Sequence, residues 1–256
     1  MDTITMDTLM HSLTLHQGAL STRARWRYNL QAVAARLKIM IPALVAHKPR
    51  RRALSKLDLE AIPYPDSALA RSAVEAMETA SSAALFHHCY RTYIWGSLLQ
   101  QLDEQQCDAE ILFVSAMLHD LGLTEQHHGC CHSGQCFTWD GVYAAKPVLA
   151  KTEPARAERI SQAILHHLNI NVPGEVHGWE AHYLQAGASL DVTGQRNTEL
   201  PAALRTQVLQ EHPRLQLKQE LQQWVDREAA LHPDSRFAAM KRLGFKGVIR
   251  KAPFAG

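Results

Sequence analysis

The chain has 256 residues, of which 46% are hydrophobic and 20% are charged, and its formal net charge is +2. This length suffices for one sizeable core, and a composition rich in Ala, Leu, Gln, Glu and Arg, with only 13 glycines, favours helices. No apolar stretch reaches the roughly 18 residues that a membrane-spanning helix needs. We also expect no secretory signal, because no basic start followed by an apolar block is seen. We therefore expect a cytoplasmic protein without a membrane partner.

The first 57 residues form a basic segment. Between residues 8 and 57 there are ten Lys or Arg and no Asp or Glu. Within residues 21–46, before a break near Pro42, apolar residues recur at helical spacing: Trp26, Leu30, Val33, Leu37 and Met40. We interpret residues 1–57 as a helical arm that packs on an acidic body, residues 58–256. One alternative is that such a segment binds an anionic surface or nucleic acid, and another is that it is an organelle presequence. Of these, nucleic-acid binding is not expected.

The sequence of the body, residues 58–256, predicts a succession of helices. After a Pro-rich stretch, Asp66 or Ser67 offers an N-cap for a long helix over residues 68–102. Asp108 would cap a central helix that is apolar on nearly every side, and residues 122–141 lack helical periodicity and are expected to form a loop. The central helix covers residues 109–118. Further helices are expected over residues 143–149, 154–168 and 180–190, followed by a polar, Gln-rich helical stretch within residues 201–231 and a docked C-terminal strap over residues 236–256. Strand alternation is absent, so the expected fold is all-α.

Four acidic or histidine side chains stand on these apolar helices. The central helix ends in the doublet His119-Asp120 before Gly122, and a terminal position lets two adjacent side chains reach one point. His88 lies inside the long helix, and Asp191 follows the apolar run that begins at Leu184. A buried Asp needs a cation or hydrogen bonds. Each residue alone would usually be a cap or a satisfied polar group, whereas together they suit Zn, Fe or Mn.

The order His, His-Asp, Asp resembles the HD-domain superfamily of metal-dependent phosphohydrolases and their relatives. The residues of several motifs between about residues 60 and 196 are similar to the corresponding motifs of the cyanamide-hydratase-like branch. These motifs are Ile62-Pro63 with Pro65-Asp66-Ser67, the run from His88 to Gly96, the run from His119 to Thr124, the run from Phe137 to Gly141, the run from Ala163 to His167, and the run from Gly187 to Gly194. A fainter likeness covers the tail from Lys251 to Phe254, and the basic arm lies outside the match.

The resemblance implies an HD-domain helical bundle in which four residues bind one divalent transition metal: His88, His119, Asp120 and Asp191. Zinc is expected, with iron or manganese as alternatives. The chain departs from the family at Cys89, where Ser is common, and at Thr138, where an acidic residue is common. These departures bear on the substrate rather than on the metal.

We expect a metal-dependent hydratase, a carbon–oxygen lyase, or a hydrolase that adds water to a small nitrile-like substrate of the cyanamide type. A metal with an open position lowers the pKa of bound water toward about 7. Asp120 would also accept a proton, and His167 would donate one to the developing anion. Arg91, Thr124 and Trp139 are the expected substrate contacts.

Other functions stay open. An HD-domain phosphohydrolase acting on a nucleotide or small phosphate ester is the main alternative, although such a site would favour several Lys or Arg, and only Arg91 lies near a proposed ligand. A dinuclear iron oxygenase would need further histidines such as His128, His132, His166 or His167. A non-enzymatic adaptor with a structural metal is a third alternative, and a homo-oligomer is compatible with all of them.

The segment over residues 127–136 holds three of the five cysteines and three histidines. An odd cysteine count in an intracellular-looking protein argues against a disulfide framework. A Gly-containing lid, an extra structural zinc site and a second catalytic metal are the three interpretations of this segment.

Overall fold

The computed structural model describes residues 19–40, 54–130 and 136–255, and these residues form helices and no strand. The prediction of an all-α fold is therefore confirmed. None of the helices in this part of the chain is both long and apolar enough to span a bilayer. The helices in chain order are α2 (Thr22–Met40), α5 (Ala68–Ala80), α6 (Ala83–Leu102), α7 (Ala109–Leu118), η1 (Leu121–Leu123), α8 (Phe137–Leu149), α9 (Pro154–His166), α10 (Gly174–His177), α11 (Trp179–Thr193), η2 (Asn197–Glu199), α12 (Ala202–Glu211), α13 (Leu217–Leu231), α14 (Arg236–Arg242) and α15 (Phe245–Lys251).

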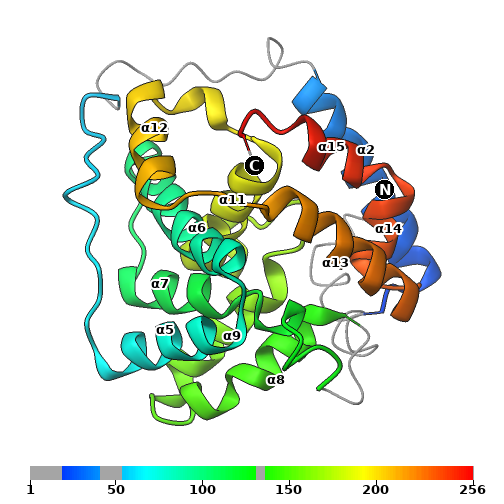
Figure 1. The fold of residues 1–256 in the computed structure, drawn as a ribbon, viewed down its shortest axis with the longest axis horizontal. Coiled ribbons are helices and arrows are strands. Elements are labelled where there is room, and N and C mark those ends of the chain that lie inside the picture. The colour runs from blue at the N-terminus through cyan, green and yellow to red at the C-terminus, as the bar shows by residue number, and fades with distance from the viewer. Residues whose placement is uncertain (1–18, 41–53, 131–135, 256) are drawn as a thin grey trace.

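The main core lies where α6 and α11 cross, with α7 and α9 packed beside them (Figure 1). Two glycines make this crossing close. A Cβ atom on Gly187 would lie 2.2 Å from the backbone oxygen of Thr92, and one on Gly96 would lie 2.7 Å from the backbone oxygen of Tyr183. Because neither residue has a side chain, the two helix backbones can approach directly. This approach lets polar side chains of α6 reach Asp191 on α11.

The helices α13, α14, α15 and α2 cover one side of this bundle (Figure 1). Apolar side chains of α13, α14 and α15 form a second cluster that includes Leu221, Phe237 and Ile249, whereas Ala24 and Tyr28 of α2 pack with Ala239 of α14. The tail is docked, as expected, because Phe254 is buried in the main core and Lys218 donates to the backbone oxygen of Ala252 at 3.1 Å.

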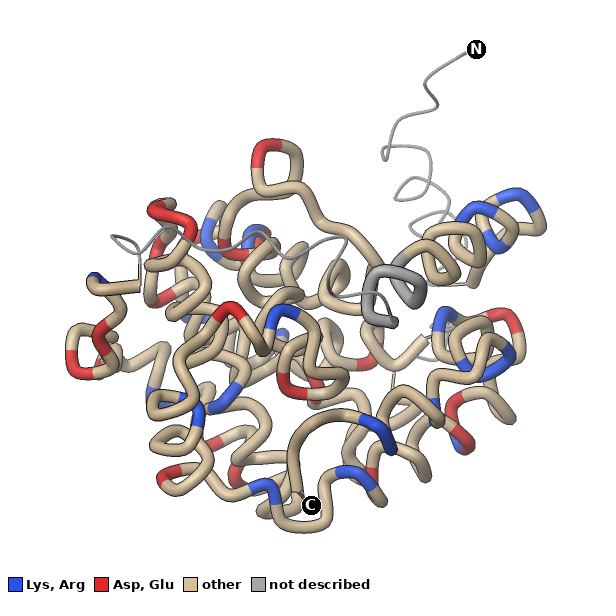
Figure 2. Tube along the Cα trace, turned by 90° about the horizontal axis from the view of Figure 1, so that it is seen from above, with Lys and Arg blue, Asp and Glu red and all other residues tan. Residues whose placement is uncertain are grey.

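The basic helix α2 carries no acidic residue (Figure 2) and packs on the body through an unexpected face. Tyr28 is fully buried and donates to the backbone oxygen of Leu168 at 3.0 Å. By contrast, three members of the apolar series noted in the sequence point to solvent, with exposed fractions of 66%, 51% and 46% for Trp26, Leu30 and Val33. Residues 1–18 and 41–53, with four of the ten basic residues, lie outside the description, as do the side chains of residues 35–40, with two more.

Two predicted caps are confirmed, whereas the prediction of one helix over residues 68–102 is wrong. The Ser67 side chain accepts from the N–H of Ala70, and the Asp108 side chain accepts from two N–H groups of α7. The long helix is broken at Ser81, and Ser82 caps α6 by accepting from the N–H of Leu85. Serine competes for backbone hydrogen bonds and therefore favours caps over helix interiors.

One other boundary differs from the prediction. Residues 137–141 were expected in a loop but form the first turn of α8. The helical stretch expected within residues 201–231 is present as two helices, α12 and α13, because residues 212–216 contain Pro213 and Leu215 has a positive φ of 51°. Proline cannot donate a backbone hydrogen bond, so it ends a helix more readily than the surrounding composition suggests.

Candidate metal centre

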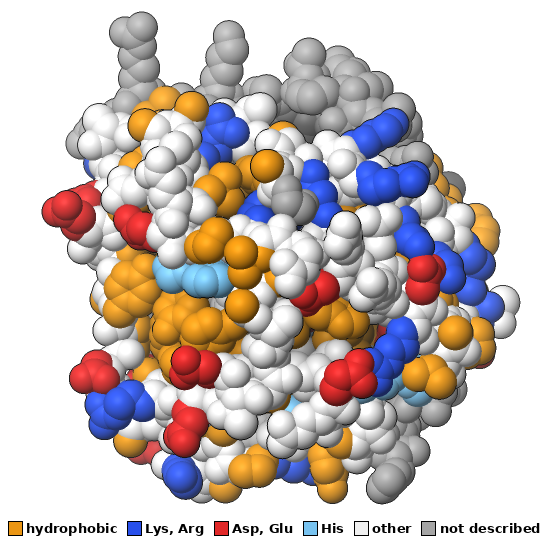
Figure 3. Space-filling model, in the orientation of Figure 1, with side chains coloured by type: hydrophobic (Ala, Val, Ile, Leu, Met, Phe, Trp, Pro, Cys, Tyr) orange, Lys and Arg blue, Asp and Glu red, His pale blue; other side chains and the backbone are white. Residues whose placement is uncertain are grey.

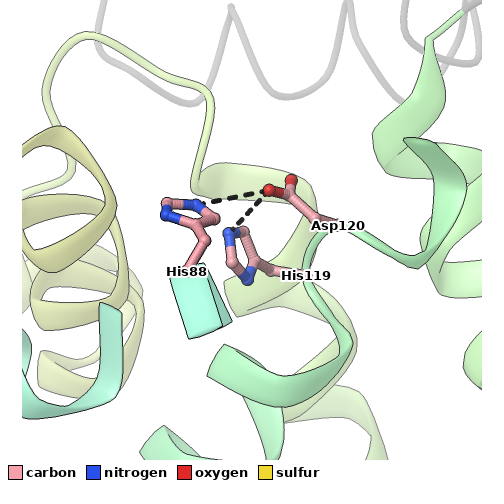
Figure 4. A group of neighbouring side chains, drawn as sticks. All are labelled: His88, His119 and Asp120. Carbon is pink, nitrogen blue, oxygen red and sulfur yellow. Dashed lines mark ion pairs between the residues drawn. The ribbon is translucent and has the colours of Figure 1, made fainter. Parts of the chain in front are cut away.

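His88, His119 and Asp120 form a buried group at the centre of the bundle (Figure 4). Their ligand atoms all lie within 4.8 Å of one another. The Oδ2 atom of Asp120 is 3.1 Å from Nε2 of His119 and 3.4 Å from Nε2 of His88. The exposed fractions of the three residues are 1%, 1% and 4%. An imidazole pair with a carboxylate is a donor set that zinc, iron or manganese accepts.

The end of α7 explains how two adjacent residues meet at one point. The helix stops at Leu118, so His119 is its C-cap residue and Asp120 already has the non-helical angles φ −108° and ψ 11°. The bend turns both side chains toward α6, which carries His88. The convergence expected from a doublet at a helix end is thus what the structure shows.

His167, just beyond α9, approaches the same carboxylate from the opposite side. Its Nε2 atom lies 3.5 Å from Oδ1 of Asp120, and its ring packs edge-on against His119 with the centroids 4.8 Å apart. His166 turns elsewhere, with Nδ1 3.1 Å from Nδ2 of Asn169 and its ring against His177. Of the two adjacent histidines, His167 is therefore the one beside Asp120.

The hydrogen bonds of the three rings determine where their lone pairs point. Nδ1 of His119 donates to the backbone oxygen of Ala116 at 2.8 Å, and Nδ1 of His167 donates to that of Ile164 at 2.6 Å. A carbonyl oxygen can only accept, so both Nδ1 atoms carry a proton. Nδ1 of His88 faces the carboxylate of Asp191 at 2.8 Å, which also requires a donor.

Neutral rings with protonated Nδ1 atoms present three Nε2 lone pairs to the carboxylate of Asp120. Such an arrangement is repulsive unless a proton or a cation lies between them. Nε2 of His119 is buried and makes no hydrogen bond of good geometry, although Asp120 is near. A buried nitrogen lone pair without a partner is what a metal ligand requires, so these residues fit a bound divalent metal.

Without a metal, a proton takes the place of the cation. Burial lowers the pKa of His119, but the neighbouring Asp120 carboxylate outweighs it and raises that pKa to about 10. Burial would raise the pKa of Asp120, but His119 and the other two histidines hold it well below its usual value. Burial lowers the pKa of His167 to about 4, so this ring is neutral near pH 7.

Asp191, the fourth predicted ligand, is occupied by other partners. Oδ1 and Oδ2 accept from Nε and Nη2 of Arg91 at 2.8 and 3.0 Å, and Oδ1 accepts from Trp95 at 3.1 Å. Arg214 lies 3.0 Å from Oδ1 and donates to the backbone oxygen of Asp191 at 2.7 Å. Burial raises the pKa of Asp191, but Arg91 and Arg214 hold it well below its usual value. Its role as a ligand stays a prediction, and in the structure it orients His88.

The three expected substrate contacts have other neighbours in the structure. Arg91 is fully buried, and its Nη1 atom donates to the backbone oxygens of His212 and Pro213. The Thr124 hydroxyl donates to the backbone oxygen of Leu121 at 2.7 Å. Trp139 packs against the second apolar cluster. None of the three lines the cavity beside the metal group, and their roles toward substrate stay predictions.

That cavity, of about 140 Å³, opens onto His88, His119, Asp120 and His167. An apolar wall of its lining comes from the C-terminal helices and includes Leu221, Phe237, Met240, Phe245 and Val248. Sequence reasoning missed this wall, because its members come from three helices with no common motif. It also missed Arg214, whose only signal is an isolated Arg after a Pro in an otherwise helical region.

The segment over residues 127–136 is only partly described, and Cys131 and His132 lie outside the described residues. His128 turns to Glu228 on α13, with Nε2 3.1 Å from Oε2, rather than to the group of Figure 4. The Sγ atom of Cys130 lies 3.5 Å from the backbone oxygen of Asp140. The three interpretations of this segment stay predictions.

A comparison with models of known protein families finds no match to this chain, and a comparison with curated proteins finds none either. The assignment of the metal centre therefore rests on the geometry of its residues.

Proposed function

We propose that the protein is a metal-dependent hydratase or hydrolase of the HD-domain type, which adds water to a small nitrile-like compound. The observation that carries the proposal is the convergence of three imidazole Nε2 atoms on the buried carboxylate of Asp120. This group borders a cavity, so one side of it is accessible to a small molecule. The resemblance of the motifs around His88, the His119-Asp120 doublet and Asp191 to the cyanamide-hydratase-like branch adds to it.

His88, His119 and Asp120 would hold the metal, which we expect to be zinc, with iron or manganese as alternatives. When bound, such a metal supplies Lewis-acid activation of water near neutral pH. Asp191 keeps His88 in the tautomer with a proton on Nδ1 and so leaves Nε2 for coordination. The clamps of Arg91 and Arg214 hold Asp191 itself in place.

His167 is suited to move a proton within the cavity. It is neutral near pH 7, it carries its proton on Nδ1, and its Nε2 atom faces Asp120 and the cavity. We propose that Nε2 first accepts a proton from the attacking water and then returns it to the developing anion. The donor role expected from the sequence becomes the second half of this relay.

A phosphohydrolase is the less favoured alternative. Phosphate recognition calls for several Lys or Arg donors. Among the described residues that line the cavity there is no Lys or Arg, and the nearby Arg91 and Arg214 are committed to Asp191.

A substrate panel tests the proposal with purified protein loaded separately with zinc, iron(II) and manganese. The panel pairs cyanamide and small nitriles with nucleotide phosphates and simple phosphate esters, and the products are measured by chromatography. We expect urea or amide products that are lost in His119→Ala and kept in His182→Ala. His182 is a suitable control because it bonds to the backbone oxygen of Val172, away from the site. Release of phosphate without any amide or urea would overturn the proposal.

A further inference from the structure

The lining of the cavity beside the metal group has two chemically different parts. One part is the histidines and Asp120, and the other is an apolar wall from the C-terminal helices: Leu221 of α13, Phe237 and Met240 of α14, and Phe245 and Val248 of α15. A molecule that fills the cavity therefore meets the polar group with one part and an apolar wall with the rest.

The volume of the cavity limits the size of the molecule that can bind against the apolar wall. Its volume is about 140 Å³, and an apolar cavity of roughly 150 Å³ in another protein accommodates benzene. Cyanamide has only three heavy atoms and would leave most of this volume unfilled. Empty apolar space next to a small polar ligand forfeits dispersion contacts and favours a larger occupant.

Apart from the metal group, the described lining of the cavity holds no charged side chain. Asp120 is the one carboxylate among these residues, and they include no Lys or Arg. The buried Arg236 of α14 donates to Asn169, Thr138 and the backbone oxygen of Leu165. The other basic side chains of α14, Lys241 and Arg242, are exposed, and basic side chains gather on this part of the surface (Figure 3). A charged substituent away from the metal would therefore be buried without a partner, which favours an uncharged occupant.

One face of α11 supplies further polar groups to the lining. Gln185, Ala188, Ser189, Val192 and Thr193 line the cavity at the spacing of a single helix face. Nε2 of the buried Gln185 donates to the hydroxyl of Ser189 at 2.9 Å. No described residue donates to the Gln185 side-chain oxygen, which is therefore able to accept from an N–H of a bound molecule.

We infer that the substrate is an uncharged compound in which a nitrile-type carbon is joined to an apolar group of about the size of a benzene ring. This inference rests on the proposed hydratase function and adds the class of substrate. The nitrile carbon faces the metal group, and the ring lies against α13, α14 and α15. The Gln185 oxygen accepts from the amide nitrogen of the product.

The reaction balances without any further reactant. The water oxygen forms the C=O double bond of the amide, both O–H bonds of the water break, the C≡N bond loses both of its π components, and the two water protons end on nitrogen. Benzonitrile would thus become benzamide, with no change in redox state and no leaving group. Asp120 and His167 are the groups that lie close enough to carry these protons.

Binding and turnover, measured separately, test the inference on the metal-loaded protein. We expect benzamide to bind at least about tenfold more tightly than acetamide in titration calorimetry, because burial of the ring removes apolar surface from water. We also expect kcat/KM for benzonitrile to exceed that for acetonitrile and cyanamide by at least about tenfold.

Two variants of the cavity wall, Met240→Ala in α14 and Val192→Phe in α11, sharpen the test. In Met240→Ala the wall recedes, so the preference should shift toward 2-naphthonitrile by at least about threefold relative to benzonitrile. In Val192→Phe the cavity is filled, so benzamide binding should fall at least about tenfold while the metal content stays at the wild-type level. Leu231→Ala is the matched control, because Leu231 is 57% exposed and lies away from the cavity.

The possible failures are distinguishable. Turnover of cyanamide or acetonitrile that equals turnover of benzonitrile, with no response to either wall variant, would overturn the inference and keep the proposed function. Tight benzamide binding that both wall variants alter, without hydration of any nitrile, would overturn the proposed function and with it the assignment of the ring compound as substrate.

Discussion

Nδ1 of His88 lies 2.8 Å from Oδ2 of Asp191, and both residues are almost completely buried. This contact joins α6 to α11 and fixes which nitrogen of His88 faces Asp120. A carboxylate that holds the far nitrogen of a ligand histidine is a common second layer of metal sites and tunes their affinity.

Asp191→Asn should therefore weaken metal binding rather than abolish it. Loss of such an outer carboxylate typically lowers metal affinity about 10- to 100-fold, whereas Asp120→Asn should remove binding because it removes a ligand. Competition with a fluorescent chelator measures both affinities. Equal loss in the two variants would show instead that Asp191 coordinates the metal directly, as the sequence resemblance implies.

Asp191→Asn should also destabilise the metal-free fold. The variant leaves Arg91 and Arg214 buried with a neutral amide, and breaking a buried ion pair costs about 3–5 kcal/mol. The control is Asp234→Asn, which breaks the partly exposed pair with Arg25 and should cost no more than about 1 kcal/mol. Urea unfolding of chelator-treated protein measures both, and similar free energies of unfolding for the two variants would contradict the clamp.

The close crossing of α6 and α11 predicts opposite effects for two Gly→Ala changes. At Gly187 the new Cβ would lie 2.2 Å from a backbone oxygen, so Gly187→Ala should destabilise the fold by more than about 2 kcal/mol. Gly247 lies in α15 with its nearest neighbour, the flexible end of Arg250, 4.0 Å away. Gly247→Ala should stabilise by up to about 1 kcal/mol. Thermal unfolding compares the two, and a harmless Gly187→Ala would refute the close contact.

The raised pKa of His119 predicts a pH-dependent stability of the metal-free protein. The pKa is about 10 in the folded state and 6.5 ordinarily, so this group contributes fully below pH 6.5. The contribution is lost as the pH rises through 10. The free energy of unfolding should therefore fall from pH 6.5 to pH 10 in metal-free wild type and fall less in His119→Gln. Parallel profiles for the two proteins would contradict the shift.

The contacts of Glu228 indicate that α13 stabilises the first turn of α8. Its buried carboxylate accepts from the N–H of Phe137 at 2.9 Å and faces Nε2 of His128 at 3.1 Å. Glu228→Ala leaves a buried donor unsatisfied and should cost about 1–3 kcal/mol. Glu125→Ala, which removes a side chain that is 89% exposed and paired with Arg227, should stay within about 1 kcal/mol. Chemical denaturation distinguishes them, and equal costs would contradict the assignment.

The sequence allowed prediction of those parts of the site that depend on local chemistry. His119 and Asp120 end an apolar helix before a glycine, and this local pattern was enough to predict that they converge. The partners of Asp191 were not predictable in this way, because Arg214 reaches it from a segment whose path depends on Pro213 and Leu215.

The fold class followed from composition and periodicity, whereas the boundaries depended on competition between local signals. The break at Ser81 interrupts a run with good helix propensity on both sides, so periodicity alone carries through it. The burial of Tyr28 in place of Trp26 depends on which face of α2 meets α14, and this choice is tertiary. The cavity is made by side chains from distant helices and has no sequence signature.

The metal content of purified protein tests the central claim most directly. Wild type and His182→Ala, loaded with zinc and freed of excess by gel filtration, should each retain one metal per chain by elemental analysis. Asp120→Ala and His119→Ala should retain less than about a tenth of that amount, because each loses a ligand from a group with few donors. Equal metal content in wild type and both ligand variants would contradict the assignment of His88, His119 and Asp120 as the metal centre.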